Sequence, residues 1–277
     1  MKKLICFAAV LALLLCGCGA KEVAETTAPE ATQETTPPEP DPVEAATEKE
    51  LIAALAESAK VVLTADIKLP QALDMQTLDL PARTLDGNGY TITGRAYDKE
   101  NTATENVLQL RYGTVQNVTV KGSYRTLGDS ADCPMVGEVY LKNVSTDDTT
   151  VAMHVGRGST SGKLYAEDCT FRGWTIISQI QDVKINNCTF GYTSEGKDGY
   201  FRTFRAMTLT NCNFESFVKE DGTVLKYNIS FHPTASGVTL CLTDCYVDGT
   251  LITQENIESL LNITLLDNQI AVRNTVS

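Results

Sequence analysis

The sequence predicts an all-β repeat fold, in which short strands alternate with corners and successive coils of chain stack on one another. Three observations predict it. The stretch VKINNCTF at 183–190 recurs as LYAEDCTF at 164–171, MTLTNCNF at 207–214 and LCLTDCYV at 240–247. From residue 60 to about residue 252, β-branched and leucine-rich runs are separated by Gly, Asn and Asp. The asparagine or aspartate of the stretch recurs about every 25 residues, a period typical of stacked repeats.

Each coil is expected to turn at this asparagine or aspartate. In 183–190, the apolar residues before Asn187 alternate in one phase, and Cys188 and Phe190 alternate in the other. A left-handed backbone at Asn187, which Asn and Asp tolerate better than most residues, turns the chain so that both sets point inward. The expected corner residues, separated by 26, 25, 19, 24, 33 and 23 positions, are Asn117, Asn143, Asp168, Asn187, Asn211, Asp244 and Asp267.

The cysteines of the repeats are expected to form a ladder of buried free thiols. Cys169, Cys188, Cys212 and Cys245 directly follow corners, and Val144 and Asn268 take the same place in other coils. A zinc site is not expected, because no Cys-x-x-Cys pair or histidine adjoins them. Disulfides remain the alternative in an exported protein, although Cβ atoms stacked about 4.8 Å apart suit a bridge poorly.

The first 18 residues read as an export signal. MKKLICFAAVLALLLCGCG places two lysines before an apolar stretch and small residues before Cys18. The segment 15–18, Leu-Cys-Gly-Cys, resembles a bacterial lipobox, which implies that Cys18 carries a lipid. The chain is then expected at the bacterial cell surface, anchored to the membrane on its extracytoplasmic side. An ordinary secretory signal is the alternative.

Residues 19–46 are expected to form a disordered linker. Residues 21–50 contain nine acidic and two basic residues, together with five of the nine prolines. Such a composition cannot bury enough apolar surface to offset the entropy of ordering. Because the negative charge is concentrated here and basic residues are not clustered, nucleic acid is not an expected partner.

The folded domain is expected to span 47–277 and to begin with a helix. Thr-Glu-Lys-Glu at 47–50 matches a capping box and opens ELIAALAESA. TQENIESLL at 253–261 is the other helical pattern, and the remainder is too uniform to suggest two domains.

This helix leads into AKVVLTADIKLP and LDGNGYTITG and then into V-x-L-x-N-C-x-F coils. In this order the region 47–277 resembles the pectate-lyase-like superfamily. The resemblance implies a right-handed, single-stranded parallel β-helix, a solenoid with a short N-terminal capping helix. Members of that superfamily include polysaccharide lyases, glycoside hydrolases and surface proteins without known activity, so the resemblance assigns no chemistry.

Two functions fit such a domain: a non-catalytic module that binds glycan or acts as an adhesive, and, as the alternative, a small polysaccharide lyase or glycoside hydrolase acting on extracellular polysaccharide. A lyase is expected to show clustered acidic residues that hold calcium, and a hydrolase paired carboxylates on neighbouring coils. Asp147 and Asp148 are interpreted as a turn. The other carboxylates are assigned to corners and surface, namely Glu167, Asp168, Asp182, Glu215 and Asp248. Catalytic residues are therefore not assigned, and neither a metal nor a cofactor is expected.

A polar stripe on the sheet that precedes each corner is the candidate ligand site. Strand alternation in VAMHV turns His154 to solvent, and alternation in YNISFHP does the same for Ser230 and His232. Residues at comparable places complete the stripe: Gln109, Arg111, Gln179 and Arg202.

A neutral or anionic glycan is expected to lie across this stripe. Arg111 and Arg202 would contact acidic groups, and the two histidines would donate hydrogen bonds. An ordinary solvated sheet face is the alternative. Four aromatic residues either flank the stripe or fill the next corner: Tyr124, Trp174, Tyr192 and Phe217.

Overall fold

Strands make up about half of the described chain, and helices form two short segments. The computed structural model describes residues 41–70, 73–74, 83–95, 106–158, 161–197 and 199–275. The expected export signal with Cys18, and the expected linker as far as residue 40, lie outside the described residues. The predicted all-β class is confirmed, with long parallel sheets.

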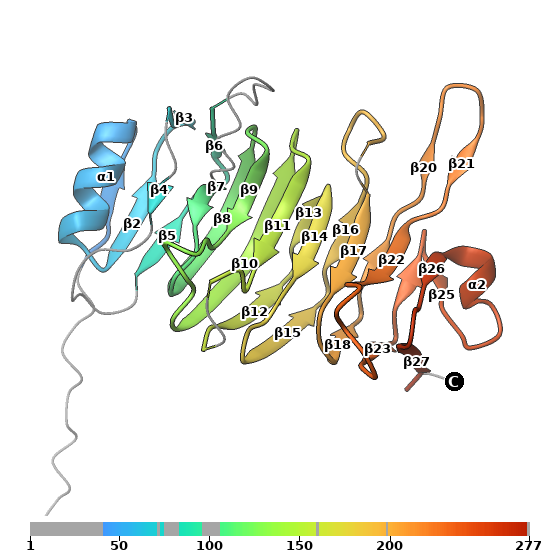
Figure 1. Cartoon of the computed structure of the whole chain (residues 1–277). Coiled ribbons are helices and arrows are strands. Elements are labelled where there is room, and N and C mark those ends of the chain that lie inside the picture. The colour runs from blue at the N-terminus through green and yellow to red at the C-terminus, as the bar shows by residue number, and fades with distance from the viewer. Residues whose placement is uncertain are drawn as a thin grey trace, which may run out of the picture. The chain divides into compact units, whose positions relative to one another are not determined.

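In sheet A, each strand that precedes a corner pairs in parallel with the equivalent strand of the next repeat (Figure 1). These strands are, in order of pairing, β1 (Val43–Ala45), β2 (Lys60–Leu63), β5 (Thr84–Asp86), β8 (Gly113–Lys121), β10 (Glu138–Asp147), β12 (Lys163–Glu167), β15 (Asp182–Asn186), β18 (Met207–Thr210), β23 (Thr239–Thr243) and β27 (Gln269–Arg273). The register places Leu141, Ala166 and Ile185 side by side, so one inward position recurs from repeat to repeat.

Beyond the corner, sheet A continues through the ends of β8 and β10 and through β3 (Ile67–Lys68), β6 (Thr91–Thr93), β13 (Thr170–Arg172), β16 (Thr189–Gly191), β19 (Asn213–Phe214) and β24 (Tyr246–Val247). β25 (Thr250–Leu251) pairs antiparallel with β24. A separate hairpin joins β20 (Phe217–Val218) to β21 (Val224–Leu225).

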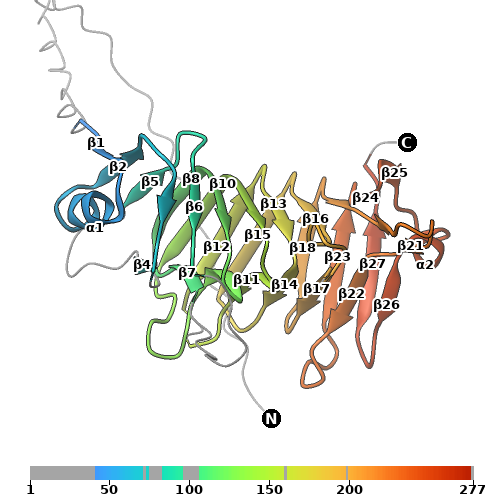
Figure 2. The same cartoon turned by 90° about the horizontal axis from the view of Figure 1, so that it is seen from above.

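Sheet B is parallel throughout and carries the candidate site. Its strands are β4 (Leu73–Asp74), β7 (Asn106–Gln109), β9 (Arg125–Gly128), β11 (Val151–Val155), β14 (Trp174–Ile177), β17 (Tyr200–Thr203), β22 (Asn228–Phe231) and β26 (Asn262–Thr264). Figure 2 shows these strands along one side of the domain and β13, β16 and β24 along the other. The chain therefore visits three strand positions in each repeat and returns to its starting sheet.

Six of the seven predicted corners are confirmed. Their φ angles lie between 49° and 55°, in the left-handed region, at Asn117, Asn143, Asp168, Asn187, Asn211 and Asp244. Side chains of neighbouring corners also contact one another. The Asn143 amide donates to Asn117 Oδ1 at 3.0 Å, and the Asn187 amide donates to Asp168 Oδ1.

The seventh predicted corner, Asp267, is wrong. Thr243 of β23 pairs with Arg273 of β27, so Asn274 lies opposite Asp244. The positive φ in the last loop belongs to Leu266. Asn268 does not extend the cysteine ladder, because its amide donates to the Ala235 carbonyl at 3.1 Å and accepts from the Val238 N–H at 3.0 Å. The additional chain between β24 and β27 shifted the apparent repeat.

The four ladder cysteines are buried as predicted, and Val144 shares their inward position. Each thiol lies within hydrogen-bonding distance of the carbonyl two residues earlier, at 3.2 Å for Cys188 and Asn186 and 3.3 Å for Cys212 and Thr210. The cysteines of the described residues form no disulfide. Beside them, the rings of Phe171, Phe190 and Phe214 lie one above another in the core.

Helix α1 (Glu48–Glu57) begins at the predicted capping box. Thr47 Oγ1 accepts from the Glu50 N–H at 3.3 Å, and Glu50 Oε2 accepts from the Ala46 N–H at 2.9 Å. β1 lies inside the range assigned to the linker, so the first described strand begins at Val43, four residues before the expected domain boundary. α2 (Ile257–Leu260) falls in the second helical pattern. Neither described helix has the length and apolar character needed to span a bilayer.

Candidate functional site

The outward side chains of β7, β9, β11, β14, β17 and β22, called here the sheet B face, form two neighbouring rows. Strand register puts His154, Ile176, Arg202 and Ser230 in one row. The other row includes Trp174, Tyr200 and Asn228. In these strands the alternate residues Thr175, Phe201 and Ile229 point into the core.

Aromatic rings and a guanidinium stack on this face. The rings of Trp174 and Tyr200 have centroids 4.8 Å apart, and Arg202 Cζ lies 4.9 Å from the Tyr200 centroid. Arg202 Nε donates to Ser230 Oγ at 3.3 Å. Next to them, Phe204 stacks on His232 with centroids 3.7 Å apart. We call Trp174, Tyr200, Arg202, Phe204 and His232 the aromatic stripe.

The structure brings only part of the predicted polar stripe together. Arg202, Ser230 and His232 meet on the aromatic stripe, whereas His154 and Gln109 lie in the same row farther toward the N-terminal repeats. Arg111 follows β7 in a bend, where its carbonyl accepts from Val136 and Gly137.

Gln179 does not belong to the row, and its predicted place is wrong. Ile176 lies opposite His154, and Gln179 follows β14 in an exposed bend beside Gly156. The cause is the phase of β14, in which Trp174 and Ile176 face outward and Thr175 and Ile177 face inward. A register irregularity in β11 between Val151 and Met153 adds to the shift.

Of the four aromatic residues singled out in the sequence, Trp174 flanks the site. Tyr192 and Phe217 pack against each other beyond β16, with centroids 6.0 Å apart, and fill a corner. Tyr124 lies under the Arg125 guanidinium, 5.4 Å from it. Tyr200 and Phe204 were missed, although the alternation in GYFRTF places Tyr200 in phase with Arg202.

His154 lies on the outer side of the sheet, as predicted, but it is not exposed to solvent as the sequence analysis expected. Its Nε2 lies 3.2 Å from Ser178 Oγ. Burial, together with the charges of Arg157 and Arg125, lowers the pKa of His154 to about 3. His232 is more open, with Nδ1 2.8 Å from Thr234 Oγ1; desolvation and the charge of Arg202 lower its pKa.

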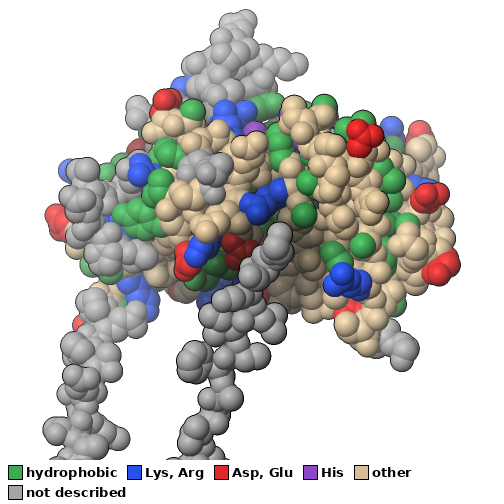
Figure 3. Space-filling model, turned by 60° about the horizontal axis from the view of Figure 1, so that its bottom comes forward, with side chains coloured by type: hydrophobic (Ala, Val, Ile, Leu, Met, Phe, Trp, Pro, Cys, Tyr) green, Lys and Arg blue, Asp and Glu red, His purple; other side chains and the backbone are tan. Residues whose placement is uncertain are grey.

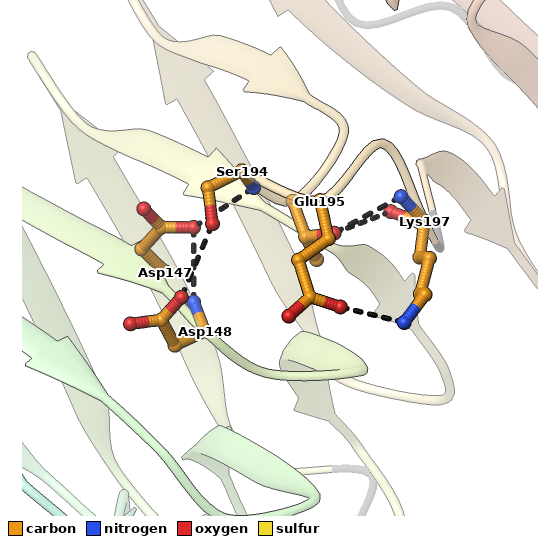
Figure 4. Close-up of polar contacts among 6 residues, drawn as sticks. Asp147, Asp148, Ser194, Glu195 and Lys197 are labelled. Carbon is orange, nitrogen blue, oxygen red and sulfur yellow. Dashed lines mark hydrogen bonds and ion pairs between the residues drawn. The ribbon is translucent and has the colours of Figure 1, made fainter. Parts of the chain in front are cut away.

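A polar groove of about 460 Å³ lies next to the N-terminal ends of β9 and β11. Its lining residues are Ser123, Asp148, Thr149, Thr150, Thr193, Ser194, Glu195 and Lys197. Asp147 Oδ1 accepts from the backbone N–H of Asp148 and of Ser194, and Asp148 Oδ1 accepts from Ser194 Oγ at 3.1 Å (Figure 4). The two aspartates therefore form a turn that holds the loop at 193–197. Within the part of the chain that the structure describes, no three His, Cys, Asp or Glu side chains are grouped to hold a metal ion.

The carboxylates considered for hydrolysis are engaged away from the sheet B face. Glu215 pairs with Arg172 at 2.7 Å, and Asp248 accepts from the Ser216 N–H at 3.1 Å. Asp182 accepts from the Tyr165 hydroxyl at 3.3 Å. These three carboxylates belong to corners and to sheet A, so none of them borders the aromatic stripe.

Sheet A carries a second stacked pair on its outer side. Tyr140 and Tyr165 have centroids 4.9 Å apart, and the hydroxyl of Tyr140 donates to Glu138 at 2.7 Å. Glu138 also pairs with Lys163. On the face drawn in Figure 3, positive and negative side chains are interspersed among polar ones, with no broad area of either sign.

Comparison of the chain with protein-family models, with curated proteins and with solved structures finds no match.

Proposed function

We propose that the described domain is a right-handed parallel β-helix of the pectate-lyase-like type and that it binds glycan without catalysis. We propose further that the chain is a lipoprotein, held at the bacterial cell surface by a lipid on Cys18. Parallel pairing of strands about one repeat apart supports the solenoid. The right hand follows from the strong preference of parallel crossover connections.

The aromatic stripe carries the proposal of glycan binding. Sugar rings expose patches of C–H groups on one side and hydroxyl groups around the rim. The stacked rings of Trp174 and Tyr200 supply a rigid apolar surface for the C–H groups. Arg202 and Ser230 border this surface with hydrogen-bonding groups for the hydroxyl groups. The groove with Ser194 and Thr150, next to the N-terminal ends of β9 and β11, offers further hydrogen-bonding groups.

A lyase or hydrolase activity has no comparable support. The aromatic stripe is bordered by a guanidinium and hydroxyl groups, and the candidate carboxylates are held in corners and on sheet A. A non-catalytic module is therefore the function that the geometry favours.

Binding can be tested on a glycan array with protein that lacks the first 18 residues. We expect Trp174→Ala and Tyr200→Ala each to weaken binding of the glycan found by about tenfold, the effect of losing one well-stacked ring. Tyr140→Ala and Tyr165→Ala are the matched controls, because they remove an equivalent stacked pair from sheet A. Binding of no glycan, or equal losses in both pairs of variants, would contradict the proposal.

A further inference from the structure

The C-terminal end of the stacked repeats leaves part of the hydrophobic core uncovered. In β23, Leu240 and Leu242 point inward and are completely buried. Their partners in β27, Ile270 and Val272, also point inward but are only partly buried. The cause is that no further strand of the described chain pairs with β27. The last inward row therefore lacks the cover that the rows before it receive.

The two ends of the stack differ in how they are closed. At the N-terminal end, α1 packs on β1 and β2 and buries Leu51 and Leu55 (Figure 1). At the C-terminal end, α2 projects past β26 and borders a groove of about 420 Å³ together with β26 and Ile270 (Figure 2). Because α2 stands beside β26, the open side of this end is β27. A second copy can approach β27 but cannot stack on β1.

The backbone of β27 offers hydrogen-bonding groups on its outer edge. The Gln269 N–H and the Arg273 carbonyl form hydrogen bonds with residues that flank β23, at 3.0 and 2.9 Å. Because the groups of a strand alternate between its two edges, Ile270 and Val272 direct their N–H and C=O groups away from β23. An edge of this kind is a template for pairing with another chain.

β27 is complementary to itself when a second copy runs antiparallel to it about Ala271. In this register Ile270 lies opposite Val272 of the second copy, so the outer N–H and C=O groups of both residues find partners. Residues that lie opposite each other share one face of a sheet. The uncovered inward side chains of the two copies would therefore close against each other.

The charges at the two ends of β27 suit the same register. Arg273 would lie opposite Gln269 of the second copy, with Asp267 diagonally across and within reach of a long side chain. Both charged side chains are exposed. A two-fold axis brings this opposite-charge contact together twice, once on either side of Ala271.

We infer that two copies of this chain associate tail to tail, with β27 against β27 around a two-fold axis at Ala271. The projecting α2 makes the two domains meet at an angle and touch along β27. Their α1 helices then lie at opposite ends of the pair. This inference does not depend on the proposed glycan binding.

Sedimentation velocity over a range of concentrations tests the pairing, with protein that lacks the first 18 residues. We expect a reversible dimer. Arg273→Asp and Asp267→Lys should each weaken it by at least about tenfold, because either change sets like charges against each other at both symmetric contacts. Lys142→Asp, which reverses an exposed charge in the middle of sheet A, is the control and should leave the dimer unchanged.

An equimolar mixture of Arg273→Asp and Asp267→Lys is the sharpest test. In a pair with one chain of each kind, position 273 of either chain again faces the opposite charge at position 267 of the other. Association should therefore return to within about threefold of the parent.

Amide hydrogen exchange locates the contact. The N–H groups of Ile270 and Val272 should exchange at least about tenfold more slowly when the protein is concentrated enough to pair. The N–H groups of Gln269 and Ala271, which face β23, should be protected at every concentration.

A protein that stays monomeric up to about 1 mM would overturn the inference and leave this end to another partner. A dimer that both charge reversals leave intact, or a mixture that does not restore association, would also overturn it. A negative glycan array would leave these experiments unaffected.

Discussion

His154 shows how neighbouring repeats change the chemistry of a single strand residue. Its outward direction follows from the alternation in VAMHV, which fills the core with Met153 and Val155. Its neutral state does not follow from this alternation, because the burial and the two guanidinium charges come from residues before and after the strand. The same residue in an isolated strand would titrate near its ordinary pKa.

Stability should therefore depend on pH through His154. Its pKa is about 3 in the folded protein, below the ordinary 6.5, so the unfolded chain binds more protons between these values. The contribution of His154 to the free energy of unfolding should be fully present above pH 6.5 and should be lost as the pH falls toward 3. Asp129 acts with the opposite sign, because its raised pKa favours the fold most at low pH.

Urea unfolding at about pH 7 and about pH 4.5 measures this dependence. We expect His154→Gln, which can still reach Ser178, to lose less stability between the two conditions than the parent. His232→Gln, at the more open histidine, serves as the control and should follow the parent. A parent and a His154→Gln variant with the same change would show that His154 is not buried in its neutral form.

The left-handed corner residues and the buried cysteines that follow them are the features that recur most regularly. The left-handed residue turns the strand, and the following cysteine enters the core with its sulfur against the carbonyl two residues earlier. We expect Cys169, Cys188, Cys212 and Cys245 to react with a polar thiol reagent at least about tenfold more slowly than the half-buried Cys133, because reaction requires local opening. Mass spectrometry of labelled peptides measures each rate.

Equal rates at all five positions would contradict the buried ladder. Labelling that appears only after reduction and unfolding would instead support disulfides between neighbouring coils.

The corners were predictable because their signal is local: Asn or Asp changes the strand phase within eight residues. The last corner was not, because the chain carrying β25 and α2 displaces Asp267 from the register of β23 and β27. The outward residues of sheet B were harder to predict than the corners. Its strands are four or five residues long around the site, so alternation alone did not separate Gln179 from Ile176.

The whole chain is proposed to be held at the membrane through Cys18, which follows Leu15 and Gly17 in the lipobox-like segment. Cys18→Ala should release the protein from the membrane fraction or stop its maturation, and lipid label should disappear from it. Cys16→Ala, in the same segment, is the control and should remain anchored. An unchanged membrane fraction and lipid label in Cys18→Ala would refute lipidation at this residue.

Parallel stacking also determines how the domain would respond to force. Tension applied on the N-terminal side of Val43 enters at β1, which is held by three residue pairs with β2 and by the packing of α1. Each row of sheet A pairs only with the rows before and after it, so a pull along the stack loads one row at a time. The rows should peel in succession at low force, as in unzipping, instead of shearing together. A domain built in this way would lengthen gradually under load and keep its C-terminal repeats intact while the first ones yield.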